Sequence, residues 1–105
     1  MSYQVFCALL AVATRHNDYD EFEAEAKSVC DAISRGQASY IWGVARRPTA
    51  DAIRSFAGLS RAAFSRAYGI PVRSMEAWSV GDRTPPDYTI NLLAYAVMCS
   101  APLDA

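Results

Sequence analysis

The sequence has little of the chemistry that metal sites and enzymes require. It contains one histidine and three widely spaced cysteines, with no C-x-x-C pair and no spacing that would let His16 share a zinc ion with them. It also lacks a glycine-rich phosphate loop, a nucleophile elbow and any histidine near a cysteine or serine in a catalytic pattern. We therefore expect no cofactor, no metal and no enzymatic activity. Cys7, Cys30 and Cys99 are expected to be free and buried in a reducing compartment.

Long hydrophobic runs are missing as well. The apolar run at residues 5–13 is far shorter than the roughly 20 residues that a membrane-spanning helix needs. A signal peptide would carry a lysine or arginine before such a run, and none is present. We interpret the run as part of a buried helix, residues 3 to about 15, of a cytoplasmic protein without a membrane partner.

Net charge is small, but charged side chains are unevenly distributed. The formal net charge of −1 argues against a general polyanion binder. Residues 1–45 carry three basic and six acidic side chains, whereas residues 46–93 carry seven basic and four acidic ones. All seven basic residues of this second segment are arginines, and the planar guanidinium group of arginine suits both phosphate and guanine. A basic face is therefore expected in the second half of the chain.

The N-terminal third of the sequence predicts an antiparallel helical hairpin. After the first helix the apolar pattern breaks, and Asn17 or Asp18 can cap a second helix. Acidic side chains in the first turn of this helix suit its dipole and give the hairpin an acidic outer surface. Gly36 stands where a C-terminal cap is expected. The inner face of the second helix consists of Phe22, Ala26, Val29, Cys30 and Ile33.

The middle of the chain is less regular. Residues 37–48 are compatible with a short helix or with an irregular connection packed by aromatic side chains. Thr49 is the expected N-cap of a further helix, which ends near Gly58. The side chains of this helix that are expected to face inward are Ile53, Phe56 and Ala57.

The stretch SRAAFSRAYGIPVRSMEAWSVG predicts two short helices joined by a tight turn. Ser60 is the expected N-cap of a helix at residues 61–68, and Gly69 can adopt the left-handed conformation that ends it. Pro71 suits the start of the next helix, at residues 72–79. Helix, glycine turn and helix is the order of a helix-turn-helix motif. The side chains of the second helix that face the core are Met75 and Trp78.

The last helix, residues 88 to about 99 with Asp87 as its expected N-cap, is apolar nearly all round. Such a helix must be covered on more than one side, by the N-terminal hairpin or by a second subunit. Its two apolar stripes are Ile90, Leu93, Ala94 and Val97, and Leu92, Tyr95, Ala96 and Cys99. We expect an all-α fold, a compact bundle of five or six helices. It would combine an N-terminal hairpin extension (1–48) with a helix-turn-helix domain (49–105) in one compact unit.

The longer stretch LSRAAFSRAYGIPVRSMEAWSVGDRTPP resembles the helix-turn-helix domain of the Cro/C1 phage-repressor type, the XRE family. The resemblance covers about residues 49–97. Arg61 stands where this family usually has glutamine, and Ser79 where it usually has glutamate. The positions that match are Leu59, Ser60, Phe64, Gly69, Ile70, Ser74, Met75, Trp78, Gly81, Arg83 and Pro85.

The resemblance implies that the helix at residues 72–79 is a recognition helix that lies in the major groove of DNA. Arg73 would then contact guanine, because a bidentate arginine–guanine pair is the commonest specific contact. The implied base-reading residues are Val72, Arg73, Ser74 and Ala77. The implied phosphate contacts, which set the register on the duplex, are Ser60, Arg61 and Arg83.

We therefore expect a sequence-specific DNA-binding transcription regulator, either phage-derived or an antitoxin-like autorepressor. Duplex DNA and a second copy of the chain are the expected partners, because one such motif reads only a few base pairs. The hairpin is expected to cover the last helix within one subunit. Its acidic outer face, residues 20–31, would turn away from DNA and be free for a protein partner. The alternative is a helix-turn-helix scaffold for protein–protein interaction without DNA affinity, which Val72, Ala77 and the negative net charge favour.

Overall fold

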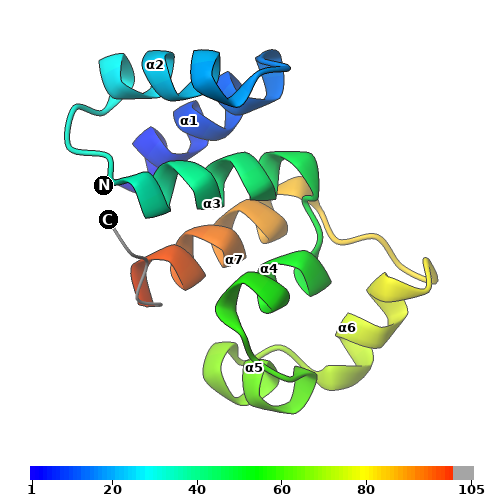
Figure 1. The fold of residues 1–105 in the computed structure, drawn as a ribbon. Helices are drawn as coiled ribbons and strands as arrows, with labels where there is room; N and C mark the ends of the chain where they lie inside the picture. Colours follow the sequence, from blue (N-terminus) through cyan, green and yellow to red (C-terminus); the bar gives the residue numbers. More distant parts are fainter. Residues whose placement is uncertain (101–105) are drawn as a thin grey trace.

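The computed structural model describes residues 1–100, which form seven α-helices and no strand (Figure 1). The expected all-α class is confirmed. None of the described helices is long and apolar enough to cross a membrane. In chain order the helices are α1 (Tyr3–Arg15), α2 (Tyr19–Val29), α3 (Arg35–Arg46), α4 (Ala50–Ala57), α5 (Arg61–Tyr68), α6 (Val72–Ser79) and α7 (Asp87–Ser100).

Most helices begin where a short polar side chain can accept a backbone hydrogen bond. Asp18, and not Asn17, caps α2, because its carboxylate accepts from the Glu21 N–H. Thr49 and Ser60 cap α4 and α5 in the same way, as expected. Asp87, the expected cap of α7, is instead its first residue, and the carbonyl of Pro86 accepts the first hydrogen bonds of that helix.

The expected end of the second helix was wrong. Helix α2 ends at Val29, and Gly36 lies in the first turn of α3 instead of closing α2. The reason is a capping box, in which the Ser34 hydroxyl accepts from the Gln37 N–H while the Gln37 side chain accepts from the Ser34 N–H. Ile33, the last residue of the apolar pattern expected for α2, lies in the loop before α3 and is buried in the core.

Helix α3 is the centre of the molecule. The segment that was compatible with a helix or a loop is a full helix, which packs against α1, α2, α4 and α7. The Tyr40 hydroxyl donates a buried hydrogen bond to the carbonyl of Ala94, so α3 and α7 are joined by a polar contact as well as by packing. Burial raises the pKa of Tyr40 far above its usual value, which keeps the hydroxyl a donor.

The last helix was expected to be covered by the N-terminal hairpin, and of this hairpin α1 packs against α7. The rings of Tyr3 and Phe6 meet the Tyr95 ring edge to face, each at a centroid distance of 5.5 Å. Helix α2 packs against α1 and α3, with Phe22 on Trp42 at 5.3 Å. In Figure 1, α2 lies at the end of the molecule opposite to α5 and α6.

Several of the side chains expected to face inward are only partly covered, among them Val29 of α2, which is 41% exposed. Phe56 is 44% exposed. Its ring lies across α3, so close to Gly43 that a Cβ atom there would be 2.8 Å from the ring. Trp78 is half-buried on α6. Trp78 packs against the core, which is one continuous cluster from α1 to α7, and the Phe56 ring meets the buried Tyr40 ring edge to face at 5.7 Å.

Candidate nucleic-acid interface

The turn between α5 and α6 has the expected geometry. The Ser60 hydroxyl accepts from the Ala63 N–H at 3.2 Å and starts α5. Gly69 ends that helix with φ of 70°, a left-handed conformation that favours glycine. Pro71 follows at the N-cap position of α6, and no side chain caps that helix. The N-terminus of α6 therefore keeps its partial positive charge available to an anion.

Two buried side chains anchor this pair of helices. Phe64 on α5 and Met75 on α6 are almost completely enclosed. Phe64 also packs against the ring of Tyr68 at 4.8 Å. Because the inner faces are held in this way, the opposite face of α6 points to solvent.

The four expected base-reading residues differ in exposure. Arg73 is exposed, whereas Val72, Ser74 and Ala77 are half-buried. Ser74 and Ala77 flank one side of α6, and Val72 lies near the other side at the start of the helix. Arg73 is therefore the residue of this set that can reach furthest from the protein.

The structure brings Arg83 next to these residues. The backbone N–H groups of Asp82 and Arg83 donate to the Ala77 carbonyl at 2.9 and 3.4 Å and fold the loop back onto α6. The result is a depression of about 560 Å³, which Arg73 and Arg83 both line. The remaining residues that line it are Pro71, Ser74, Ala77 and Asp82.

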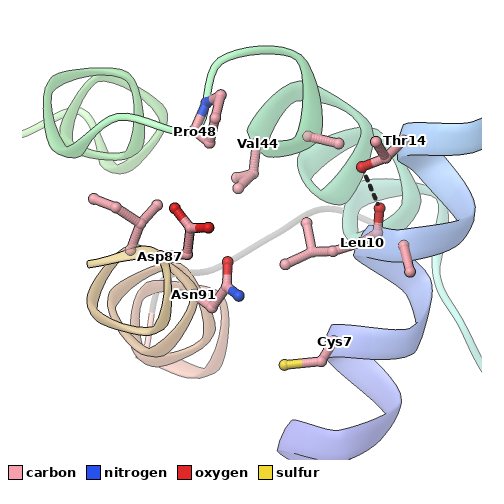
Figure 2. Close-up of a pocket in the computed structure, with 10 residues that line it drawn as sticks. Cys7, Leu10, Thr14, Val44, Pro48, Asp87 and Asn91 are labelled. Atoms are coloured by element: carbon pink, nitrogen blue, oxygen red, sulfur yellow. Dashed lines mark hydrogen bonds between the residues drawn. The ribbon is translucent and has the colours of Figure 1, made fainter. Parts of the chain in front are cut away.

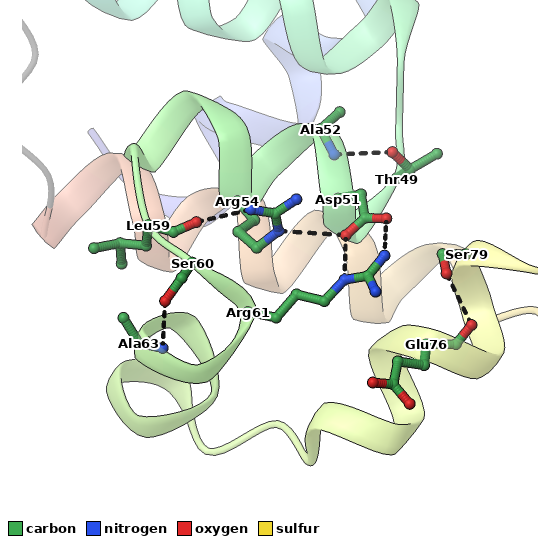
Figure 3. A network of polar contacts seen from close by, with 10 residues as sticks. All are labelled: Thr49, Asp51, Ala52, Arg54, Leu59, Ser60, Arg61, Ala63, Glu76 and Ser79. Carbon is green, nitrogen blue, oxygen red and sulfur yellow. Dashed lines mark hydrogen bonds and ion pairs between the residues drawn. The ribbon is translucent and has the colours of Figure 1, made fainter.

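Arg61, an expected phosphate contact, forms an ion pair with a carboxylate of the same chain (Figure 3). Its Nη2 and Nε atoms lie 3.0 and 3.4 Å from the two carboxylate oxygens of Asp51 on α4. Arg54 shares the same carboxylate at 3.3 Å and also donates to the Leu59 carbonyl at 2.8 Å. The Arg61 guanidinium, with help from Arg54, lowers the pKa of Asp51, and Asp51 raises the pKa of Arg61. The network fastens α5 to α4 and retains one net positive charge.

Ser60 is exposed at the N-terminus of α5. Its oxygen already accepts the capping hydrogen bond, but the hydroxyl hydrogen can still be donated to a phosphate. Of the three expected phosphate contacts, Ser60 and Arg83 are thus open to solvent, while Arg61 would first have to share or leave Asp51.

Two exposed residues on the same face were not identified from the sequence. Glu76 lies one turn after Val72, and Val80, just past the end of α6, is 72% exposed. A carboxylate here can accept from the amino group of cytosine, and an apolar side chain can contact a thymine methyl group. The spacing of Glu76 and Val80 from Arg73, three and seven residues, could have indicated the shared face.

The acidic N-terminal hairpin holds a separate polar cluster. Glu25 on α2 accepts from His16 at 2.8 Å and from Arg15 at 2.7 Å, so it ties the end of α1 to α2. The hydrogen bond from His16, followed by the charge of Arg15, lowers the pKa of Glu25. His16 is therefore a structural partner at the C-terminus of α1. All three cysteines are free, but none is fully buried as expected: Cys7 and Cys30 are half-buried, and Cys99 is exposed.

Comparison with known proteins gives no match: no protein-family model, no curated protein and no solved structure is similar to this chain. Within residues 1–100, no three histidine, cysteine or acidic side chains are grouped closely enough to hold a metal ion.

Proposed function

We propose that the protein binds duplex DNA through α6 and the loop that follows it, and that it acts as a sequence-specific transcription regulator. The observation that carries this proposal is that Arg73 and Arg83 line the same depression, on the exposed side of α6. The resemblance of this stretch to phage-repressor helix-turn-helix domains supports the same conclusion.

In this proposal α6 enters the major groove with its N-terminal turn nearest the base edges. Arg73 donates two hydrogen bonds to a guanine. Glu76 accepts a hydrogen bond from the amino group of a cytosine where the neighbouring base pair contains one. Arg83 and the Ser60 hydroxyl contact phosphates on either side and set the register. The anchoring of Phe64 and Met75 keeps the position of α6 fixed relative to these phosphate contacts.

The first prediction concerns the salt dependence of binding. If Arg83 and two other exposed arginines of residues 46–83 neutralise about three phosphates, the log–log slope of affinity against salt should be near −2.7, which is about a 40-fold loss between roughly 50 and 200 mM. Fluorescence anisotropy with a pool of randomised duplexes measures this slope. Absence of binding to every duplex at low salt, or binding that ignores salt, would contradict the proposal.

The second prediction concerns Asp51. Replacing Asp51 by asparagine removes the carboxylate that holds Arg61, so Arg61 becomes available to a phosphate. We expect tighter DNA binding and a salt slope steeper by about 0.9, together with a lower melting temperature because α4 and α5 lose their ion pairs. Asp31→Asn is the matched control, because it changes the net charge equally at an exposed residue between α2 and α3. Weaker binding by Asp51→Asn would show instead that the ion pair positions Arg61 for DNA.

A second copy of the chain is part of the proposal. On the outer side of α7, Tyr88 and Leu92 are 66% and 50% exposed, and Ala96 and Cys99 continue the stripe. Tyr95, expected in the same surface, is instead partly covered by α1. We propose that the open stripe forms a homodimer, which would place two copies of α6 on two DNA half-sites.

The third prediction tests this dimer. Sedimentation at micromolar concentration should give a dimer, and Leu92→Glu should raise its dissociation constant at least about tenfold, because an unpaired charge would be buried. Val29→Glu is the control, since Val29 is similarly exposed on α2. A wild-type monomer in the absence of DNA would remove the dimer from the proposal.

Protein binding without DNA affinity is the second candidate function, and one observation favours it. The exposed face of α6 and its loop carries the apolar side chain of Val80 and the carboxylates of Glu76 and Asp82, and these carboxylates would repel phosphates. The acidic outer face of α2, at the opposite end of the molecule, is the proposed site for a protein partner under either function. The salt titration separates the two, because a scaffold would bind no duplex.

A further inference from the structure

A groove of about 430 Å³ lies where α1, α3 and α7 meet (Figure 2). This is within the size range of small-molecule sites, which are mostly apolar with a few converging polar groups. Its apolar lining comes from all three helices and is formed chiefly by Leu10, Val44 and Ile90. No residue of α5 or α6 contributes to it, so the groove is separate from the proposed DNA-binding face.

The polar groups of the groove are concentrated on α7. Asp87 and Asn91 are one helical turn apart, and Figure 2 shows both side chains pointing into the space between α7 and the other two helices. Among residues 1–100 neither side chain has a hydrogen-bond or ion-pair partner. On the facing wall the Thr14 hydroxyl donates to the Leu10 carbonyl at 2.9 Å, which leaves its oxygen as an acceptor.

The charge of the lining selects for cations. Among the described residues that line the groove, Asp87 is the only charged one. The acceptors are the Asp87 carboxylate, the Asn91 amide oxygen and the Thr14 hydroxyl oxygen, and an ammonium group supplies three donors. The Asp87 carboxylate would repel an anionic ligand in this groove.

We propose that this groove binds a small organic cation, a primary amine that carries an apolar chain. The ammonium group donates to Asp87 and Asn91, and the chain lies on Leu10, Val44 and Ile90. Binding of this cation does not require DNA binding, because the groove is formed by the packing of α1 and α3 against α7. A short apolar chain fits the volume and the aliphatic character of the lining.

An NMR titration of the intact protein tests the proposal with three probes of equal chain length: hexylamine, hexanoate and hexanol. Hexylamine should produce saturable shifts at the backbone amides of Leu10, Ala11, Val44 and Asn91. Hexanoate should produce none, and hexanol only weak ones. Asp87→Asn should weaken hexylamine binding about tenfold, because a charge-assisted hydrogen bond is lost. Asp31→Asn, which removes an equal charge outside the groove, should leave it unchanged.

A second variant is needed because Asp87→Asn can also change the stability of the first turn of α7. Ala11→Met places a longer side chain in the groove at an exposed position of α1, and methionine is a good helix former. It should abolish hexylamine binding while circular dichroism and the melting temperature stay near wild type. Equal responses to hexylamine and hexanoate, shifts outside the groove, or a titration that does not saturate would overturn the proposal.

Discussion

Replacing Phe64 by alanine should lower the free energy of unfolding by about 3–5 kcal/mol, the largest effect we expect from one substitution. Phe64 is 0% exposed, and it is the one buried residue of α5 and part of the core cluster. The loss combines the transfer of apolar surface with the cavity that remains. Because small domains are stable by only about 5–15 kcal/mol, a measurable fraction of the variant should be unfolded at physiological temperature.

Phe56→Ala is the matched control for this prediction. The same atoms are removed, but the Phe56 ring keeps 44% of its surface exposed and lies across Gly43 at the edge of α3. Its loss should therefore be clearly smaller than that of Phe64→Ala in urea unfolding monitored by circular dichroism. An equal or larger loss for Phe56→Ala would mean that the contact between α3 and α4, and not the packing of α5, limits stability.

Replacing Arg73 by alanine should weaken binding to the preferred DNA sequence by about 1–3 kcal/mol, which is roughly 5- to 150-fold, and should relax the preference at one base pair. Arg73 is the exposed residue of the first turn of α6, and no carboxylate within residues 1–100 forms an ion pair with it. Its guanidinium group is therefore free to make a bidentate contact. Selection from a randomised duplex pool, followed by anisotropy on the selected and scrambled sequences, measures both effects.

Two further variants show which kind of contact is lost. Arg83→Ala should weaken binding to selected and scrambled duplexes alike, since a phosphate contact carries no sequence information. Arg35→Ala, an exposed arginine at the start of α3, should change neither. If Arg73→Ala also weakens all duplexes equally, Arg73 contacts phosphate, and the base reading must come from Glu76 or Ser74.

The helix boundaries that were predicted well are those set by neighbouring residues. Ser60 and Thr49 cap their helices, and Gly58 and Gly69 end them, because each acts through hydrogen bonds or backbone angles within a few residues. The end of α2 was missed for a related reason. The Ser34 and Gln37 capping box is also local, but the apolar pattern of α2 runs on to Ile33, so periodicity alone does not show that the helix ends at Val29.

The candidate site was predictable only as a set of residue types. The motif indicated Arg73, Ser74 and Arg83, and the structure shows that they line one depression. It could not indicate that Arg61 would be held by Asp51, because ten residues separate the two and a helix boundary lies between them. Nor could the sequence show which side of α7 would remain open, since that depends on where α1 and α3 pack.

The sequence by itself determined the all-helical class, most helix boundaries and the turn between α5 and α6, because capping, glycine conformation and apolar period act over one or two helical turns. The tertiary structure alone decided which charges remain free. It neutralised Asp51 with two arginines, left Arg73 and Arg83 exposed together, and directed Asp87 and Asn91 into a groove. The physical reason is that Coulombic pairing and surface burial depend on distances between helices, which no local pattern in a single sequence encodes.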